Sequence, residues 1–421
     1  MTTCPLQADT SADTQEGCKR RLCWTCHSDE NHKPMLTEPL KSVAIRTPLR
    51  NAEVAWFDDL CGGDTQYLGV LDEKRRSNYE HCRNIMLTAE RMGFSNILLP
   101  TSYLVGQEVI PFASAMGPQT FNINMLTALR TGEIFPTMLA RHIATLDHIL
   151  KGRLTINIIN SNLPGVIESP ELRYKRCCET IDILKQAWTK ESIDFEGKIY
   201  QVKLDTTDPV KPYQQNGGPL LYFGGISEGS KEVCAKYCDV YLMWPEPEES
   251  IYATMQDMSF RAAKYGRQID FGFRVHVIVR STEEEARAWA QSMMSKFDPA
   301  GFNLKERTQD HKSLGVLRQD EIRAKSTSDY LEPLLWGGIG RARSGCGAAL
   351  VGTPEQILWK INRYMDMGIR AFILSGYPLI EECELFGNHV LPHLSTVKLS
   401  MIQGRTPASE PVTPLTTAVL R

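Results

Sequence analysis

Residues 271–294 read FGFRVHVIVRSTEEEARAWAQSMM and contain the pattern on which the fold depends. The first nine residues are mostly apolar, which indicates a buried strand, and residues 282–294 space their apolar side chains as an amphipathic helix does. Side chains alternate along a strand, so Arg274 and His276 share one face of it. A strand followed directly by a helix is the unit from which parallel sheets are built.

The same unit recurs along the chain. Short apolar runs predict eight strands, at residues 52–57, 95–99, 122–128, 154–159, 220–223, 240–243, 271–279 and 371–374. Helical patterns lie between them, at residues 78–92, 136–149, 172–188, 227–237, 251–265, 282–294 and 354–367. Eight alternating units predict an α/β fold of the (βα)8 TIM-barrel type, and a doubly wound open sheet is the alternative.

Changes in composition set the expected domain limits. Residues 1–48 are polar and cysteine-rich and predict a disordered leader, residues 49–396 the barrel, and residues 397–421, rich in Pro and Thr, a flexible tail. Residues 192–204 predict a hairpin insertion that turns at Glu196-Gly197. The long, charged segment 297–347 precedes the last strand and predicts a mobile lid.

Bulk composition excludes several classes of protein. Hydrophobic residues make up 42% of the chain, charged residues 23%, and the formal net charge is −3. We find no basic stripe with interleaved aromatics, which argues against nucleic acid as a partner. An apolar run of about 20 residues and a signal peptide are both lacking, so we expect a cytoplasmic protein without membrane contact. The twelve cysteines are then expected to be free thiols.

The leader contains Cys23-Trp-Thr-Cys26-His27, which matches a haem-attachment pattern. Haem attachment generally requires export, and a zinc site needs four ligands at a standard spacing. We therefore favour an inert leader, with zinc as the alternative. Elsewhere the metal motif HExxH is lacking, so we predict no metal.

The candidate catalytic residues follow the strands, because barrel active sites lie at the carboxyl ends of the strands. An inward-facing Arg274 and His276 on an apolar strand need partners or a ligand, and an internal salt bridge is the alternative. Trp244 and Tyr377 follow two further strands at the same rim. Arg341 and Arg343 lie in a glycine-rich part of the lid, where they could clamp an anion or remain solvated.

The turn at residues 223–230 (FGGISEGS) suits a phosphate. Gly224 and Gly225 let the backbone approach a ligand, and Ser227 is placed to cap a helix whose N-terminus attracts an anion. An ordinary capped turn is the other interpretation.

Many ordered segments resemble the alkanesulfonate monooxygenases of the bacterial-luciferase superfamily. They span residues 64–394 and include DTQYLG (64–69), ALR (128–130), ATLD (144–147), LYFGG (221–225), RVHVIVR (274–280), GAALVG (347–352) and LSGYP (374–378). The resemblance implies a two-component (βα)8 monooxygenase that uses FMNH2 from a separate NAD(P)H-dependent flavin reductase. In the family, O2 then forms a C4a-(hydro)peroxyflavin that oxidises a small organic substrate. Relatives form homodimers or tetramers, so a homo-oligomer is expected.

The resemblance also assigns residue roles. It places Arg274, His276, Arg343, Tyr377 and Trp244 in the catalytic set. Ser227 and Tyr174 match positions that hold the FMN phosphate, and Gly224, Gly225, Asn160 and Thr127 are expected beside the cofactor. Tyr103, Val105 and Arg341 are expected to line the substrate pocket.

Three departures from the family surround the expected substrate. Val105 replaces a cysteine, Gly62 a histidine, and residues 160–162 (NSN) a Thr-Gly-Ser segment. The family's oxidation chemistry is therefore expected to be retained on an alkanesulfonate-like or other small substrate. The alternatives are a tailoring oxygenase acting on a larger metabolite, a deazaflavin-dependent oxidoreductase and a non-catalytic ligand-binding barrel.

Overall fold

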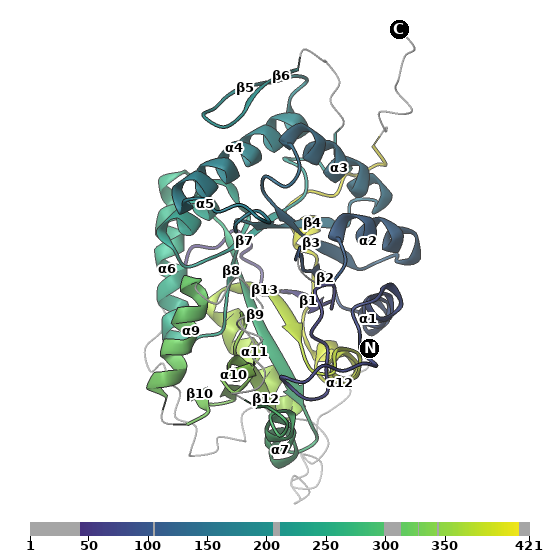
Figure 1. Cartoon of the computed structure of the whole chain (residues 1–421), viewed down its shortest axis with the longest axis vertical. Helices are drawn as coiled ribbons and strands as arrows, with labels where there is room; N and C mark the ends of the chain where they lie inside the picture. Colours follow the sequence, from purple (N-terminus) through teal and green to yellow (C-terminus); the bar gives the residue numbers. More distant parts are fainter. Residues whose placement is uncertain are drawn as a thin grey trace, which may run out of the picture. The chain divides into compact units, whose positions relative to one another are not determined.

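The apolar runs form eight parallel strands that close into a barrel (Figure 1). The computed structural model describes residues 43–103, 106–204, 211–298, 313–326, 328–342 and 345–411. Each barrel strand pairs with the next, and the last returns to the first, in the order β1 (Glu53–Phe57), β2 (Asn96–Leu99), β3 (Asn124–Arg130), β4 (Leu154–Ile159), β7 (Leu221–Gly224), β8 (Val240–Met243), β9 (Asp270–Val279) and β13 (Ile369–Ser375). The predicted barrel is confirmed, and the open-sheet alternative is wrong.

Helices surround this barrel, and side-chain caps set several of their starts. Asn78, Ser169 and Ser227 each accept a hydrogen bond from a first-turn N–H, while Thr282 and Thr353 form capping boxes. The outer helices are α1 (Tyr79–Met92), α2 (Val109–Met116), α3 (Pro136–Ile149), α4 (Pro170–Thr189), α5 (Glu228–Tyr237), α6 (Glu248–Lys264), α7 (Glu283–Met293), α11 (Pro354–Met367) and α12 (Leu379–His389). Among the helices of the described residues, none is long and apolar enough to cross a membrane.

Side-chain alternation fills the barrel interior. Ala55, Leu98, Leu126 and Tyr222 belong to one buried interior cluster together with Val240, Ala371 and Ile373. All ten residues of β9 are buried, as the predicted central strand requires. On each strand the residues next to these interior positions face the helices.

Both predicted insertions contain regular structure. The hairpin is formed by β5 (Ile193–Glu196) and β6 (Gln201–Leu204), and it projects beyond α4 (Figure 1). The Glu179 carboxylate holds its turn by accepting the N–H groups of Lys198, Ile199 and Tyr200 at 2.9 Å each. The segment before the last strand forms α9 (Leu314–Lys325), β10 (Tyr330–Glu332), β11 (Leu335–Trp336), α10 (Ile339–Ala342) and β12 (Ala349–Gly352). Strands β10, β11 and β12 extend the sheet from β9.

A buried ionic cluster ties β10 to the barrel. The Lys360 ammonium lies 2.6 Å from a carboxylate oxygen of Glu248 and 2.6 Å from one of Glu332. Glu332 also accepts the Glu248 N–H at 3.0 Å and the Tyr364 hydroxyl at 3.3 Å. The β10 part of the predicted lid is therefore fixed to α6 and α11 through buried charges.

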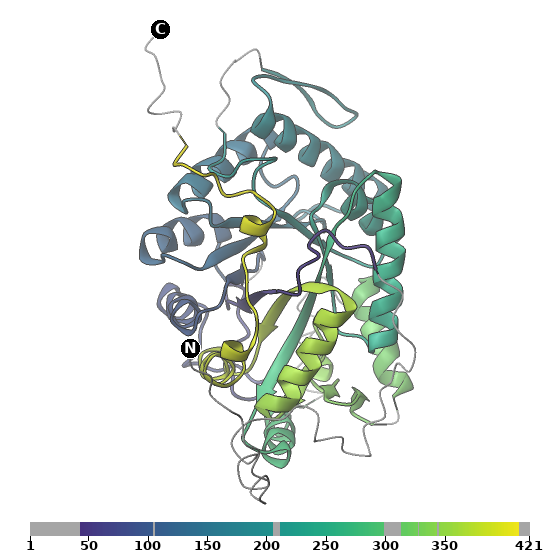
Figure 2. The ribbon, with the colours of Figure 1, turned by 180° about the vertical axis from the view of Figure 1, so that it is seen from behind.

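Two short segments outside the predicted barrel limits pack on its amino-terminal end (Figure 2). Arg46 and Arg405 both donate to the Asp239 carboxylate, at 2.7 and 3.0 Å. Thr47 donates its N–H and hydroxyl to Asp270, which Gln403 also contacts. Leu399, in α13 (Leu399–Ile402), joins the interior cluster. Residues 43–48 and 397–405, placed by prediction in the leader and the tail, thus close this end of the barrel.

The loop between β1 and α1 is held by a buried carboxylate. Asp64 accepts the N–H of Leu379 at 2.9 Å, and its other oxygen lies 2.9 Å from His81 Nε2. This hydrogen bond to Asp64 raises the pKa of His81. The loop is thereby linked to both α1 and α12.

We expect the contribution of His81 to stability to depend on pH. Because its pKa is raised in the folded protein, the contribution is fully present below the unfolded value of about 6.5 and is lost as pH rises through the folded pKa. Urea unfolding from pH 5.5 to 9 should show the free-energy gap between wild type and His81→Gln narrowing as pH rises. A gap that stays constant over this range would contradict the expectation.

Candidate active site

The carboxyl end of β9 places a guanidinium and an imidazole inside the barrel. Arg274 is 7% exposed, and its guanidinium lies 4.5 Å from the centre of the Phe57 ring. It donates to the carbonyls of Val275 and Ile373, both at 3.3 Å. Among the described residues it forms no ion pair with a carboxylate, and burial lowers its pKa. An internal salt bridge, the alternative interpretation, therefore lacks a carboxylate for Arg274 among the described residues. A buried cation without such a partner favours an anionic ligand.

His276 is held at both ring nitrogens. Its Nδ1 lies 2.6 Å from Ser375 Oγ, and its Nε2 lies 3.2 Å from the carbonyl oxygen of Cys346. A carbonyl can only accept, so the proton of the neutral ring is on Nε2, and Nδ1 accepts from the Ser375 hydroxyl. The Tyr377 ring lies 5.3 Å from the imidazole, measured between centroids. Tyr377 thus lies against His276, and Arg274 precedes His276 by two positions on the same face of β9. The catalytic roles of the three residues stay predictions.

Three hydroxyls meet at the N-terminus of α5. Tyr174 Oη lies 2.5 Å from Ser227 Oγ and 3.1 Å from Ser230 Oγ, and the two serine oxygens lie 2.9 Å apart. Gly225 has φ of +143°, and a Cβ there would come within 2.6 Å of Ser230 Oγ. A Cβ at Gly229 would come within 2.5 Å of the Tyr174 ring. Hydroxyls, a glycine turn and a helix N-terminus together suit a phosphate group.

The other predicted cofactor residues differ in placement. Asn160 directly follows β4, and both polar atoms of its amide are buried without a hydrogen-bond partner among the described residues. An unsatisfied amide of this kind suits a hydroxylated ligand. Thr127, by contrast, neighbours the interior residue Leu126 on β3, so alternation turns its side chain towards the helices. The prediction that Thr127 contacts the cofactor is not supported by this orientation.

The remaining predicted residues lie at the rim or outside the described chain. Trp244 is 36% exposed and packs against Gly315 at the start of α9. Tyr103 is 75% exposed. Arg341 pairs with Asp329 beside a cavity of about 400 Å³ that contains none of the strand-end residues. Val105, Arg343 and the cysteines of residues 1–42 lie outside the described residues.

Sequence reasoning missed three residues that shape the site. Ser375 and Cys346 hold His276, and Phe57 contacts Arg274. Alternation could have identified Phe57, which ends a predicted strand, and Ser375, which directly follows another. The Cys346 carbonyl carries no such signal, since its place depends on how the segment before β12 folds. Among the described residues, no cluster of His, Cys, Asp and Glu could hold a metal ion.

The Ser227 hydroxyl is expected to serve both the helix and the ligand. Ser227→Ala removes the cap accepted from Ser230 N–H, which should cost about 1 kcal/mol of stability. It should also raise the Kd for FMN, the cofactor that the sequence resemblance implies, because the helix N-terminus loses an anion-facing hydroxyl. Tyr174→Phe is the matched variant, since it removes a hydroxyl and keeps the cap. Flavin fluorescence titration and urea unfolding would measure both effects, and unchanged FMN affinity in both variants would argue against a phosphate site here.

Comparisons with known proteins identify the family of the chain. The family model described as luciferase-like monooxygenase matches residues 61–371. The sulfoquinovose monooxygenase of Agrobacterium fabrum is 52% identical over 368 residues, covering 86% of this chain and 95% of the relative. That of Novosphingobium aromaticivorans is 48% identical, covering 82% and 98%. The solved structure of EDTA monooxygenase from Chelativorans sp. BNC1 has a TM-score of 0.64 at 18% identity, covering 86% of this chain and 96% of that one.

Proposed function

Since the chain belongs to the luciferase-like monooxygenases, a family of flavin-dependent oxygenases, we propose that it uses FMNH2 and O2 to cleave the carbon–sulfur bond of a sulfonated sugar. Sulfoquinovose is the substrate named for both relatives, and the chain covers nearly the whole length of each. The overall reaction converts the sulfonate R–CH2–SO3⁻, O2 and FMNH2 into the aldehyde R–CHO, HSO3⁻, FMN and water.

The observation that carries this proposal is the buried Arg274 guanidinium without a carboxylate partner in the described residues. An isolated buried cation is costly and is kept where it stabilises an anion in the reaction. A sulfonate and a reduced oxygen species are both anionic. Arg274 therefore suits either the substrate head group or the charge that develops as the carbon–sulfur bond is oxidised.

The residues fit FMN as the cofactor. The Tyr174, Ser227 and Ser230 hydroxyls at the start of α5 would hold its phosphate, and the unsatisfied Asn160 amide would bind a hydroxyl of its ribityl chain. When bound in reduced form, FMN supplies the electrons that activate oxygen. The hydroxyl cluster lies at the end of β7 and Arg274 on β9, so the cofactor would extend across the carboxyl end of the barrel.

The chain's own residues position and enclose the reaction. Phe57 keeps the guanidinium of Arg274 in place. The Cys346 carbonyl keeps His276 in the Nε2–H form, and the Ser375 hydroxyl then donates to Nδ1. Tyr377 covers the imidazole and excludes water from it. We also propose that the segment around residues 297–347, with Arg343, closes over the bound anion while β10 stays fixed.

Two further parts of the proposal concern partners. Two-component members of the family draw reduced flavin from a separate reductase, and we propose the same supply here. Self-association into a dimer or tetramer is proposed by analogy with the family.

The Ser375 hydroxyl is expected to act as a positioning group. Ser375→Ala removes the hydroxyl that bonds His276 Nδ1, and the loss of a positioning hydrogen bond worth about 0.5–1.5 kcal/mol corresponds to roughly 2- to 12-fold in kcat. The ¹⁵N shifts of the His276 ring, assigned with His276→Gln, should show a changed Nδ1 resonance, because Nδ1 loses this hydrogen bond while Nε2 keeps the Cys346 carbonyl. Ser375→Thr retains the hydroxyl and should restore both readings. Equal activity and equal shifts in the alanine variant would refute the positioning role.

The direct test measures sulfite. Purified protein is supplied with FMN, NADH and a general flavin reductase. Catalase is added to every reaction, because reduced flavin that is free in solution reacts with O2 and releases hydrogen peroxide. We expect sulfoquinovose to yield sulfite and aldehyde in equal amounts, and octanesulfonate to yield far less. Release of sulfite from octanesulfonate alone would shift the substrate to simple alkanesulfonates. No sulfite from either compound, despite bound FMN, would overturn carbon–sulfur cleavage.

A further inference from the structure

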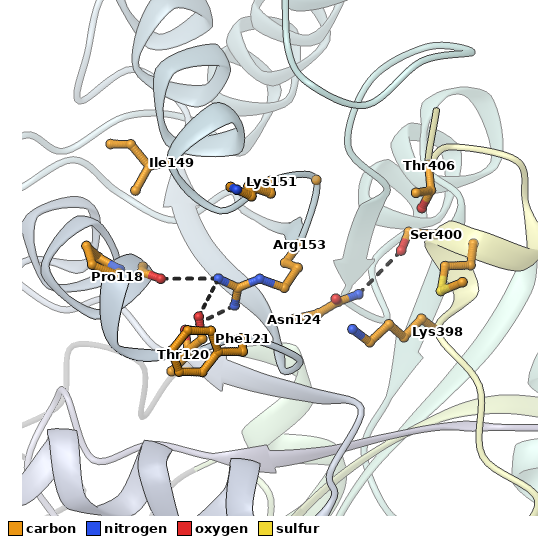
Figure 3. Close-up of a pocket in the computed structure, with 13 residues that line it drawn as sticks. Pro118, Thr120, Phe121, Asn124, Ile149, Lys151, Arg153, Lys398, Ser400 and Thr406 are labelled. Carbon is orange, nitrogen blue, oxygen red and sulfur yellow. Dashed lines mark hydrogen bonds between the residues drawn. The ribbon is translucent and has the colours of Figure 1, made fainter. Parts of the chain in front are cut away.

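A second cavity lies at the opposite end of the barrel from Arg274 and His276. It has a volume of about 460 Å³ and lies beside Asn124, the first residue of β3, and Arg153, which directly precedes β4 (Figure 3). The chain that closes the barrel base supplies its other wall, through Lys398, Ser400, Met401 and Thr406. The mechanism proposed above uses none of these residues.

Cations line this cavity without acidic side chains. Lys151, Arg153 and Lys398 are all lining residues, and none of the described lining residues is Asp or Glu. Within the described chain neither Arg153 nor Lys398 forms an ion pair. Burial lowers the pKa of Lys398, and the charge of Arg153 lowers it further, although Glu53 and Glu90 act in the opposite direction. Two cations therefore face one space across which they repel each other.

Arg153 is fixed firmly enough to serve as a preformed part of a site. Its guanidinium donates to the carbonyls of Gly117, Thr120 and Ile123 and to Thr120 Oγ1, at 2.8–3.2 Å. These acceptors are neutral, so they hold the side chain without cancelling its charge. Lys398 is less committed, with a single hydrogen bond to the Asn122 carbonyl. Its ammonium has further N–H groups for a ligand.

The remaining wall is apolar and open. Phe121 is 79% exposed, Met401 59% and Ile149 41%, and all three line the cavity. The volume exceeds what an inorganic anion such as sulfate needs. An apolar wall opposite a cationic wall suits a molecule that combines an anionic group with an apolar body.

We propose that this cavity binds a small organic oxyanion, with its sulfonate or phosphate group between Lys398 and Lys151 beside Arg153, and its apolar body on Phe121 and Met401. The site is separate from the reaction site, because the two lie at opposite ends of the strands. It is therefore suited to a ligand that is not the substrate undergoing oxidation.

The test uses 4-iodobenzenesulfonate with FMN-saturated protein. In a crystal soaked with this probe, we expect an anomalous iodine peak beside Phe121, with the sulfonate density next to Lys398. The position of the iodine peak distinguishes probe bound in this cavity from probe whose sulfonate is bound near Arg274. Titration calorimetry should show that Lys398→Met and Lys151→Met each weaken this binding by about tenfold. The neutral analogue 4-iodobenzyl alcohol should give no peak.

Lys203→Met is the matched control, because Lys203 is an exposed lysine of β6 remote from the lining residues. It should leave probe binding unchanged. Lys151 is exposed, so its variant keeps the test valid if Lys398→Met disturbs the fold. The proposal is overturned if no iodine peak appears in this cavity, if the neutral analogue binds equally well, or if both lysine variants bind the probe as wild type does.

Discussion

Arg274→Met is expected to lower kcat/KM by about a thousandfold while raising the melting temperature. Removing one preorganised donor for a developing anion costs on the order of 10²–10³ in rate, and loss of a full charge places the effect at the upper end. The stability gain follows because methionine replaces a buried cation that has no carboxylate partner in the described residues. Sulfite release and thermal unfolding measure the two effects.

Two control variants separate the effect of the positive charge at position 274 from the effect of side-chain shape. Arg274→Lys keeps a cation and should recover part of the activity. Arg280→Lys changes an arginine next to the same strand that is already paired with Glu382, at 2.5 Å, and should retain most of the activity. A methionine variant with more than about a tenth of wild-type activity would remove Arg274 from the proposed mechanism.

Lys360→Met is expected to destabilise the protein by about 3–5 kcal/mol, because it removes the cation that the buried Glu248 and Glu332 carboxylates share. Glu248 keeps Arg363 as a partner, whereas Glu332 is left without a cation among the described residues. Urea unfolding followed by circular dichroism measures the change. Adding Glu332→Gln to this variant removes one of the two charges and should recover a substantial part of the loss. The exposed Lys264 of α6 is the control, and its methionine variant should change stability by less than about 0.5 kcal/mol. A loss below 1 kcal/mol in Lys360→Met would show that β10 is held by other contacts.

Local patterns in the sequence predicted most of the barrel. All eight barrel strands and seven of the outer helices were predicted, with limits within about three residues. Alternation also placed Arg274 and His276 together on the interior face. Helix α2 (VIPFASAM) was missed because it is largely apolar and shows no amphipathic period. Helix α12 (LIEECELFGNH) was missed because it directly follows Pro378, close to the end of a strand.

Long-range pairing accounts for what the sequence did not reveal. Arg341 looked free for a substrate, but folding brings Asp329 to it. Residues 397–405 were predicted to be part of a flexible tail, because their partners Glu53, Asp239 and Asp270 are up to 346 positions away. The outward orientation of Thr127 has a local cause, since its neighbour Leu126 faces the interior and side chains alternate along the strand. Its contact with the cofactor stays a prediction. The predicted roles of Val105 and Arg343 concern residues outside the described chain and stay predictions.

The closure of the barrel base also fixes an order of events during synthesis. Strand β1 is made early, yet Glu53 receives the Leu399 N–H, and Asp239 receives Arg405, only after these late residues have been translated. Until then the apolar surface that Leu399 covers at the barrel base is exposed, and exposed apolar surface is what chaperones bind in unfinished domains. Completion of the base is therefore a late step in biogenesis, and variants that shorten residues 399–405 should accumulate as insoluble protein.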